Sequence, residues 1–286
     1  MNISSYLLTI CLLLSLLSFT GSGYAQCQPE SESCVPVGDW QFSLALGIGE
    51  LSNPLQGGDD IPLLILPYIN YYGEQFFIEN NVIGYSFYQS DQLVLSAIGQ
   101  LNREKAFFTD WQPSHLFVPN FSDSMLTESD HKTISKDDVS KRKWAVDGGI
   151  QLNWFINQST ELKVQLLHDI NQVYQGLNSQ LALYHRINIS DNAQLNLGIG
   201  ANWHSAKLND YYYGLDEKDQ VGLSNYYQAE GGINPFVSLG FYYQLTSKWQ
   251  AQIRFKQQRL SRKITDSPLV KDQQVTSAFI GVVYAF

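Results

Sequence analysis

The last fourteen residues, 273–286, constrain the fold of this chain more than any other stretch. They read QQVTSAFIGVVYAF, and alternate residues counted back from Phe286 form two sets. One set is aliphatic and aromatic and ends in Tyr284 and Phe286, while the other is mostly small or polar. Because successive side chains of a strand point to opposite faces, this alternation predicts a β-strand. Its length suits a membrane-crossing strand, which needs about 9–11 residues, although a buried edge strand of a soluble β-sandwich would also fit.

The first 25 residues predict export from the cytoplasm. They contain no Asp, Glu, Lys or Arg, residues 6–19 are largely apolar, and small residues follow at Gly21, Ser22 and Gly23. We therefore expect a signal peptide that is cleaved after Ala25. The apolar run is shorter than the ~20 residues that a spanning helix needs. The net charge of −9 argues against a nucleic-acid partner.

Two cysteines, Cys27 and Cys34, remain in the exported chain and lie in a polar N-terminal extension, residues 26–38. Closely spaced cysteines in an exported protein most simply form a disulfide bond. The alternative, a pair of metal ligands, lacks further ligands nearby, and the sequence predicts neither a metal site nor a cofactor site.

Alternation of the same kind recurs from residue 40 to the C-terminus. One face of each expected strand is rich in Leu, Ile, Val and Trp, and the other is rich in Gln, Asn, Gly and charged residues. A Lys or Arg that faces lipid at the bilayer centre costs roughly 2–4 kcal/mol, so we expect the charged residues of the polar face to line a lumen. They are Lys163, Arg186, Arg254, Lys256, Glu161 and Asp147.

The connections at one end of the expected strands are long, and those at the other end are short. Long polar segments at 105–141, 205–231 and 261–272 contrast with short turns at 157–159, 190–192 and 246–248. Outer-membrane barrels carry long loops outside and short turns on the periplasmic side. Tryptophans near strand ends suit the interfacial aromatic girdles of such barrels. The sequence therefore predicts an all-β fold, an antiparallel transmembrane β-barrel over residues 39–286.

The number of strands follows less directly. The pattern gives eleven strands, but a single-chain barrel with both ends in the periplasm needs an even number. Splitting the stretch 75–89 at Asn80-Asn81 gives twelve, which is our prediction, and ten and fourteen stay open. Pro67 inside the strand-like stretch 61–72 predicts a bulge or an irregular edge there.

Three blocks of sequence carry a family resemblance. The stretch NPLQGGDDIPLLILPYINYYGEQFFIENNVIGYSF, the pair DYYYGLDEKDQ and LSNYYQAEGGINP, and DSPLV ahead of the final strand all resemble the OmpV / MltA-interacting protein family of outer-membrane proteins. The strongest blocks are 53–87, 210–235 and 266–286. The resemblance implies a barrel of the cell envelope, either a scaffold joining a lytic murein transglycosylase to a penicillin-binding synthase, a porin-like protein or an adhesin. It implies no active site.

A search for chemistry in the sequence finds no nucleophile elbow, zinc-protease motif or P-loop, so we expect no enzymatic activity. His168 and His185 would face each other on neighbouring strands if a tight turn were centred at Gly176-Leu177. The simpler interpretation is that both lie near the outer rim, or that a bulge turns them inward. Five tyrosines in one loop suit either recognition of a partner or packing onto the barrel rim: Tyr211, Tyr212, Tyr213, Tyr226 and Tyr227.

The sequence thus predicts an outer-membrane barrel that contacts outer-membrane lipid and is inserted by the barrel assembly machinery, with Phe286 and Tyr284 as the assembly signal. Its first functional hypothesis is an envelope scaffold for murein-processing enzymes, with a lytic transglycosylase and a penicillin-binding synthase as partners. The alternatives are a small-solute pore lined by the six charged residues and a surface adhesin that acts through its external loops.

Overall fold

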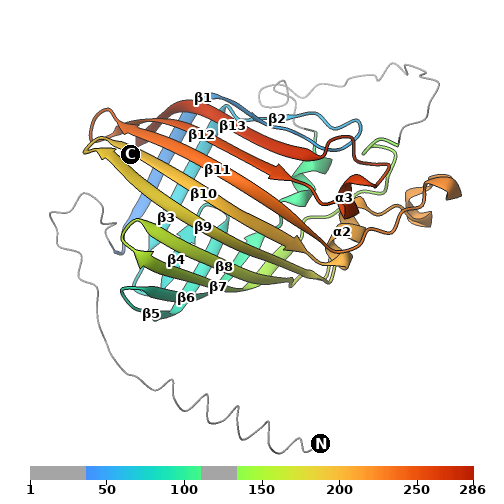
Figure 1. Ribbon diagram of the computed structural model, residues 1–286, viewed down its shortest axis with the longest axis horizontal. Coiled ribbons are helices and arrows are strands. Elements are labelled where there is room, and N and C mark those ends of the chain that lie inside the picture. The colour runs from blue at the N-terminus through green and yellow to red at the C-terminus, as the bar shows by residue number, and fades with distance from the viewer. Residues whose placement is uncertain (1–36, 111–133) are drawn as a thin grey trace, which may run out of the picture. The chain divides into compact units, whose positions relative to one another are not determined.

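The computed structural model describes residues 37–110 and 134–286. The expected signal peptide, nearly all of the expected N-terminal extension, and the expected disulfide between Cys27 and Cys34 lie outside these residues. The described chain forms a closed antiparallel β-barrel with folded loops at one end (Figure 1).

Thirteen strands form the sheet, and each pairs with its neighbour along the chain, except that the two-residue β2 (Ile61–Pro62) only lines the outer end of β1. The other strands, twelve in number, close the barrel because β13 pairs with β1. They are β1 (Trp40–Leu51), β3 (Ile65–Tyr72), β4 (Phe76–Glu79), β5 (Val82–Gln89), β6 (Leu93–Leu101), β7 (Val146–Asn157), β8 (Thr160–Asp169), β9 (Leu177–Ser190), β10 (Ala193–His204), β11 (Gly232–Gln244), β12 (Trp249–Arg259) and β13 (Gln274–Ala285). The predicted fold and strand number are confirmed.

The predicted split of residues 75–89 occurs where we placed it. Asn80, with φ of 53°, and Asn81 turn the chain between β4 and β5, and Asn tolerates this left-handed conformation better than most residues. β4 is so short that β3 pairs with it only over Asn70–Tyr72. The part of β3 that contains Pro67 therefore has β1 as its one strand partner in the described sheet, which is where a residue without an N–H is tolerated.

The barrel closes at a seam of small residues. Gly47 of β1 lies opposite Gly281 of β13, and the ring of Phe279 covers both from inside. A Cβ atom added at Gly47 would lie 2.2 Å from the Ile280 carbonyl oxygen and 2.7 Å from the Phe279 ring. Only glycine leaves room for this close approach of the two strands.

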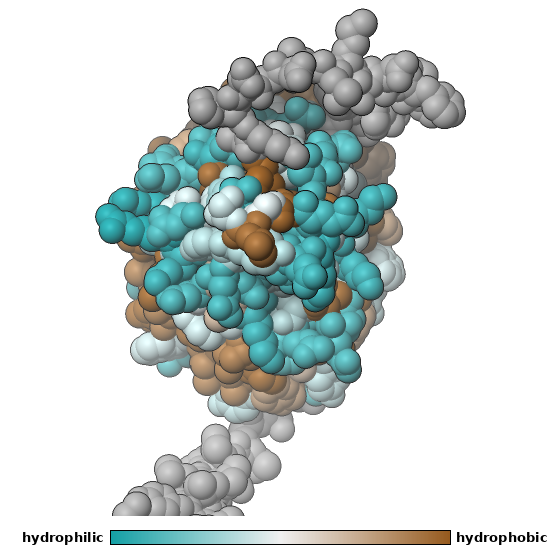
Figure 2. Space-filling view, turned by 90° about the vertical axis from the view of Figure 1, so that its right-hand side faces the viewer, coloured by the Kyte–Doolittle hydropathy of each residue, from teal (hydrophilic) through white to brown (hydrophobic). Residues whose placement is uncertain are grey.

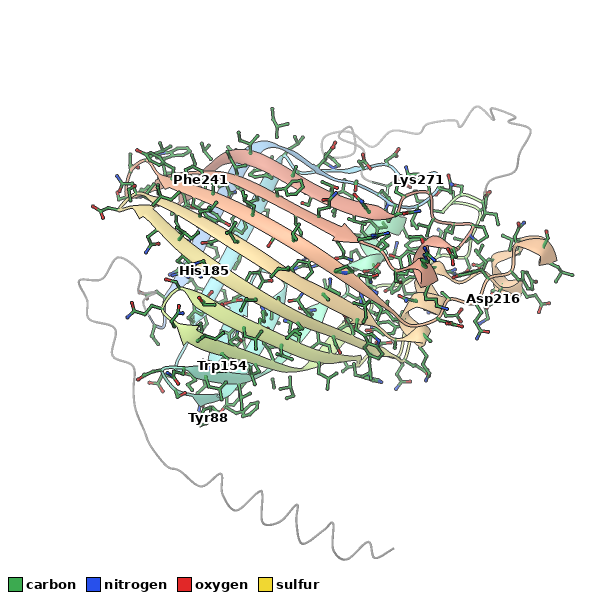
Figure 3. All side chains as sticks on the ribbon, in the orientation of Figure 1. Tyr88, Trp154, His185, Asp216, Phe241 and Lys271 are labelled. Atoms are coloured by element: carbon green, nitrogen blue, oxygen red, sulfur yellow. The ribbon has the colours of Figure 1, made fainter. Side chains whose placement is uncertain are left out.

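The two faces of the wall differ as the alternation predicts. On β13, Ile280 points outward and is 58% exposed, whereas its neighbour Phe279 points inward and is 4% exposed. Aromatic side chains gather near the strand ends on the outer surface; Tyr88 and Trp154 lie at the end with the short turns, opposite Asp216 and Lys271 (Figure 3). In the described ranges, no helix is long and apolar enough to cross a membrane.

The conditional pairing of His168 with His185 does not form, and of the two residues that we expected near the outer rim only His168 lies there. His168 pairs with Leu177 near the loop end of the barrel, and His185 pairs with Thr160 near the opposite end. The connection between β8 and β9 is an ordered loop rather than a tight turn at Gly176-Leu177, because the Asp169 carboxylate accepts hydrogen bonds from three backbone N–H groups of residues 171–175. This loop shifts the register from the one that we assumed.

Candidate functional site: the external cap and the lumen beneath it

The long loops at one end of the barrel fold together into a compact structure, which we call the cap. It contains η1 (Glu104–Phe108), α2 (Ala206–Tyr213), η3 (Glu217–Asp219), η4 (Leu223–Asn225) and α3 (Arg262–Thr265), together with residues 53–60, 134–145 and 170–176. Among these helices, α2 is capped by Ser205, which accepts a hydrogen bond from the Leu208 N–H.

The cap has its own apolar core. Tyr212, Tyr213 and Leu208 of α2 are 0% exposed, and they pack with Phe107 of η1 and Ile264 of α3. These segments come from three different loops, so their packing ties the loops to one another. Figure 2 looks onto this end and shows the described residues of the cap covering its surface, with apolar residues among hydrophilic ones and no opening visible between them.

Polar contacts anchor the cap to the barrel wall. Asp147 of β7 is 0% exposed and accepts hydrogen bonds from Asn102, Tyr174 and Asn178 at 2.8, 2.5 and 3.2 Å. Glu104 of η1 accepts a hydrogen bond from the Tyr213 hydroxyl and lies 4.0 Å from the His204 ring. Burial and the neighbouring Glu104 carboxylate hold the pKa of Tyr213 well above its usual value, so this hydroxyl stays a donor.

A buried ion pair joins two loops that are distant in sequence. The Arg142 guanidinium donates to both carboxylate oxygens of Asp219, at 2.9 and 3.3 Å, and to the Gly214 carbonyl at 3.1 Å. Ser140 donates to the same carboxylate through its N–H and its hydroxyl. Burial raises the pKa of Asp219, but the hydrogen bonds from Arg142 and Ser140 outweigh this effect and hold the pKa below its ordinary value.

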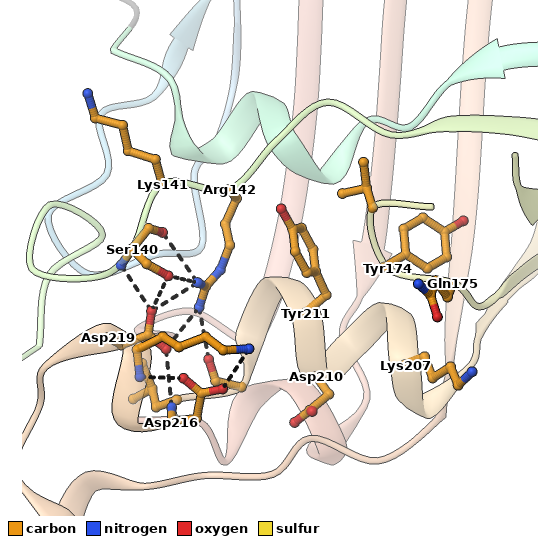
Figure 4. A pocket seen from close by; sticks show the side chains of 14 residues that line it. Ser140, Lys141, Arg142, Tyr174, Gln175, Lys207, Asp210, Tyr211, Asp216 and Asp219 are labelled. Atoms are coloured by element: carbon orange, nitrogen blue, oxygen red, sulfur yellow. Dashed lines mark hydrogen bonds and ion pairs between the residues drawn. The ribbon is translucent and has the colours of Figure 1, made fainter. Parts of the chain in front are cut away.

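Next to this ion pair the cap contains a cavity of about 380 Å³. Figure 4 shows the Arg142 side chain reaching Asp219 beside the ring of Tyr211, and the guanidinium carbon lies 5.8 Å from the centre of that ring. Lys141, Lys207 and Gln175 also line the cavity. The arrangement is a polar cavity with one aromatic wall, accessible from outside, but most of its charged groups already bind each other.

The loop tyrosines fall into two groups. Tyr212 and Tyr213 are completely buried in the core of the cap, so neither ring can touch a partner. Tyr211 lines the cavity, Tyr227 donates to the Lys263 carbonyl, and Tyr226 is 41% exposed. Packing therefore accounts for the two buried rings, and Tyr226 is the ring that is most available for recognition.

Inside the barrel, polar side chains from the inward faces of the strands form a network. Gln151 and Asn153 of β7 bond to each other, and they also bond to Gln165 and Glu161 of β8. The structure places Lys163 beside this network, opposite Asn153, and Arg186 opposite Asn196. Arg254 donates to the Tyr68 hydroxyl at 2.6 Å, and the Lys256 ammonium lies 4.2 Å from the centre of the Phe236 ring. Asp147 lies nearer to the cap end of the barrel, where it anchors the cap.

Sequence reasoning missed two residues of this region, Arg142 and Asp219. Both lie in polar loop sequence without periodicity, where no pattern indicates which charge becomes buried. In the parts of the chain that the structure describes, no group of three or more His, Cys, Asp or Glu side chains is placed to hold a metal ion.

The C-terminal residues lie at the end with the short turns. The Phe286 N–H donates to the Phe42 carbonyl of β1, and the Phe286 ring packs edge-on against Tyr284, which also contacts Trp249. Phe286 itself is 76% exposed, so it presents its ring outward from the closed seam.

The sequence is similar to known outer-membrane proteins. The family model of the MltA-interacting protein MipA matches residues 44–286. The MltA-interacting protein of Escherichia coli (strain K12) is 26% identical over 279 residues, which cover 96% of this chain and 98% of that protein. The 24 kDa outer membrane protein of Pasteurella multocida (strain Pm70) is 24% identical over 60% of this chain and 71% of its own. Outer membrane protein OmpV of Vibrio cholerae is 24% identical over 52% of this chain and 57% of its own.

These relatives are named as outer-membrane or interacting proteins and not as enzymes. The family match covers the whole barrel except the first residues of β1, which begins at Trp40. A closed antiparallel sheet is the form in which strands cross an outer membrane. The chain therefore belongs to the MltA-interacting protein (MipA) family and is a β-barrel of the outer membrane.

Proposed function

We propose that this protein is a scaffold of the outer membrane that holds a murein-processing enzyme of the lytic transglycosylase kind at the periplasmic end of its barrel. The main support is the similarity over nearly the full length of both chains to a protein named for its interaction with MltA. A penicillin-binding synthase would be the second partner, as the family resemblance implies. The protein itself would carry out no catalysis.

The cap favours a scaffold role for the protein over the role of a pore. Its apolar core and the buried Arg142–Asp219 pair hold the loops together at the external mouth. A barrel that is covered on one side still offers its other end to partners. The turns there, around residues 73–75, 90–92, 158–159, 191–192 and 245–248, connect neighbouring strands and carry no cap of their own among the described residues.

Binding to a purified partner tests this proposal. The mature barrel, immobilised in detergent, should retain a purified lytic transglycosylase of the same organism. Replacing Ser90-Asp91-Gln92 together with Thr246-Ser247-Lys248 by Gly/Ser turns should weaken retention at least tenfold. The external variant Lys218→Ala should retain the enzyme fully, because Lys218 lies at the opposite end and is exposed. No retention by the folded wild-type barrel would refute the proposal.

The alternatives rest on fewer features. A small-solute pore is favoured by the charged, solvent-accessible side chains of Arg186 and Arg254 inside the barrel, and conductance across a planar bilayer would support it. An adhesin is favoured by the projecting segment around η3 and η4, where Leu223 is 80% exposed, and it would require that removal of this segment abolish surface binding.

A further inference from the structure

The cavity of the cap is large enough to hold a small molecule. Its volume is about 380 Å³, and it is lined by α2, by the loop between β8 and β9, and by residues 140–142 and 214–219. Ligand pockets in proteins range from about 300 to 1,000 Å³. Because the cavity lies in the external loops, a ligand would reach it without passing through the barrel.

One face of α2 is directed to this cavity. Lys207, Asp210 and Tyr211 all line it, and their positions i, i+3 and i+4 place them on the same side of the helix. Leu208 and Tyr212 lie on the other side and are completely buried in the core of the cap. The helix therefore uses one face for packing and presents the other to the cavity.

The ring of Tyr211 forms an apolar wall that is fixed in position. Tyr212 packs edge-on against it with 4.9 Å between the ring centres, and the Lys143 backbone N–H donates to its hydroxyl at 2.8 Å. Unlike Tyr212, Tyr211 is only half-buried. A rigid aromatic ring that remains accessible can cover the apolar side of a ligand with little further loss of conformational freedom.

Charged side chains of both signs surround the cavity. The lining contains four cations and three carboxylates, so the two signs nearly balance. A simple anion or a simple cation would therefore meet groups of its own sign as well as groups of the opposite sign. A hydroxyl group, in contrast, can donate to a carboxylate and accept from an ammonium or a guanidinium group. This mixture favours a ligand that is rich in hydroxyl groups.

Several polar groups of the lining retain hydrogen-bonding capacity. None of the ion pairs among the described residues involves Lys207. Asp210 accepts a hydrogen bond from the Ala229 N–H through Oδ1 at 3.0 Å, which leaves Oδ2 for another donor. The side chain of Arg142 is 7% exposed, and its Nε is buried without a hydrogen-bond partner. A buried donor without a partner is destabilising, so an acceptor supplied by a ligand would stabilise this wall.

We propose that the cap cavity is a binding site for a saccharide. The ring of Tyr211 covers the apolar face of one sugar unit, and Lys207, Asp210 and Arg142 bond to its hydroxyl groups. Figure 4 shows these side chains around the cavity, with Arg142 beside the ring of Tyr211. The site lies at the end of the barrel opposite to the short turns, so this inference does not depend on the scaffold role.

Isothermal titration of the mature, folded barrel tests the site. The protein is kept in lauryldimethylamine N-oxide, because detergents with a sugar headgroup would compete. The probes are glucose, galactose and N-acetylglucosamine, with inorganic phosphate and ethylammonium as probes of charge alone. We expect saturable binding of at least one sugar, weakened at least fivefold in each of the variants Tyr211→Leu, Lys207→Gln and Asp210→Asn.

Two matched controls remove the same chemical groups elsewhere in the cap. Tyr226→Leu removes a tyrosine ring that is 41% exposed, and Lys263→Gln removes an exposed cation; neither residue lines the cavity. Both should bind sugar as the wild type does. Heat-modifiable migration in a gel confirms that each barrel is folded. If Tyr211→Leu disturbs the cap, the other two variants, which change exposed side chains, answer the same question.

A sugar could come from the medium or from the glycolipid of the cell's own surface, and competition distinguishes these sources. Displacement of the bound sugar by lipopolysaccharide extracted from the same organism indicates the surface glycolipid, whereas failure to displace it indicates a saccharide from the medium. The proposal is overturned if the folded wild type binds none of the three sugars, if phosphate or ethylammonium alone binds, or if the folded cavity variants bind sugar as well as the two controls.

Discussion

At the scale of single residues, the cap depends on Arg142. Its side chain is 7% exposed and that of Asp219 is 2% exposed, so both charges are shielded from water. A buried pair of this kind contributes little relative to apolar side chains, but removing one partner leaves an uncompensated buried charge. Arg142 also bonds to the Gly214 carbonyl, so a single side chain connects segments near residues 142, 214 and 219.

We therefore expect Arg142→Ala to loosen the cap and leave the barrel intact. Removal of one partner of a buried ion pair destabilises the structure by about 3–5 kcal/mol. We expect no other single contact of the loop to compensate for a loss of this size. Hydrogen exchange should show faster exchange of the amides at 215–220, while strand amides keep their protection. Lys218→Ala is the control, because the Lys218–Asp216 pair is exposed and spans 3.9 Å, and exposed pairs contribute about 0–1 kcal/mol. Equal exchange in both variants would contradict this role of Arg142.

At the scale of elements, closure of the barrel depends on how near β1 and β13 come to each other. The two strands pair from Ser43↔Ala285 to Leu51↔Ser277, and the facing glycines leave room for the Phe279 ring beside the seam. This pairing joins the first and last strands of the barrel and closes the sheet.

Gly47→Ala should hinder closure, since the new Cβ would meet backbone and ring atoms at less than 3 Å. Overpacking of this kind costs roughly 1–3 kcal/mol. The urea midpoint for unfolding and the heat-modifiable fraction should both fall. Gly99→Ala in β6 is the matched control, because nothing lies within 4 Å of its added Cβ. A Gly47→Ala barrel as stable as the Gly99→Ala barrel would show that the seam relaxes freely.

At the scale of the whole molecule, the chain combines a barrel with a folded cap. The first strand begins and the last strand ends at the end of the barrel with the short turns, and the cap covers the opposite end. The barrel places its apolar side chains outward, toward lipid, and its polar side chains inward. The cap inverts this order, because it buries apolar side chains above a polar lumen. Phe286 completes the outward aromatic surface beside Tyr284 and Trp249.

Deletion of Phe286 should reduce insertion into the outer membrane, because the C-terminal strand would lose its exposed terminal ring and the hydrogen bond to Phe42. The measurement is the amount of heat-modifiable barrel in isolated outer membranes. Phe286→Tyr, which keeps an aromatic terminus, should insert as the wild type does. Normal insertion of the deletion variant would exclude an assembly role for this residue.

The sequence by itself determined the strands, their two faces and the sides of the long loops, because a strand exposes alternate side chains to different media and this period of two is local. It also located the turn at Asn80-Asn81. Tertiary structure decided what local pattern does not encode. The register of β8 with β9 depends on how Asp169 organises its loop, which separated His168 from His185. The burial of Tyr212 and Tyr213 and the pairing of Arg142 with Asp219 join residues from distant loops, and such contacts exist only in the folded cap.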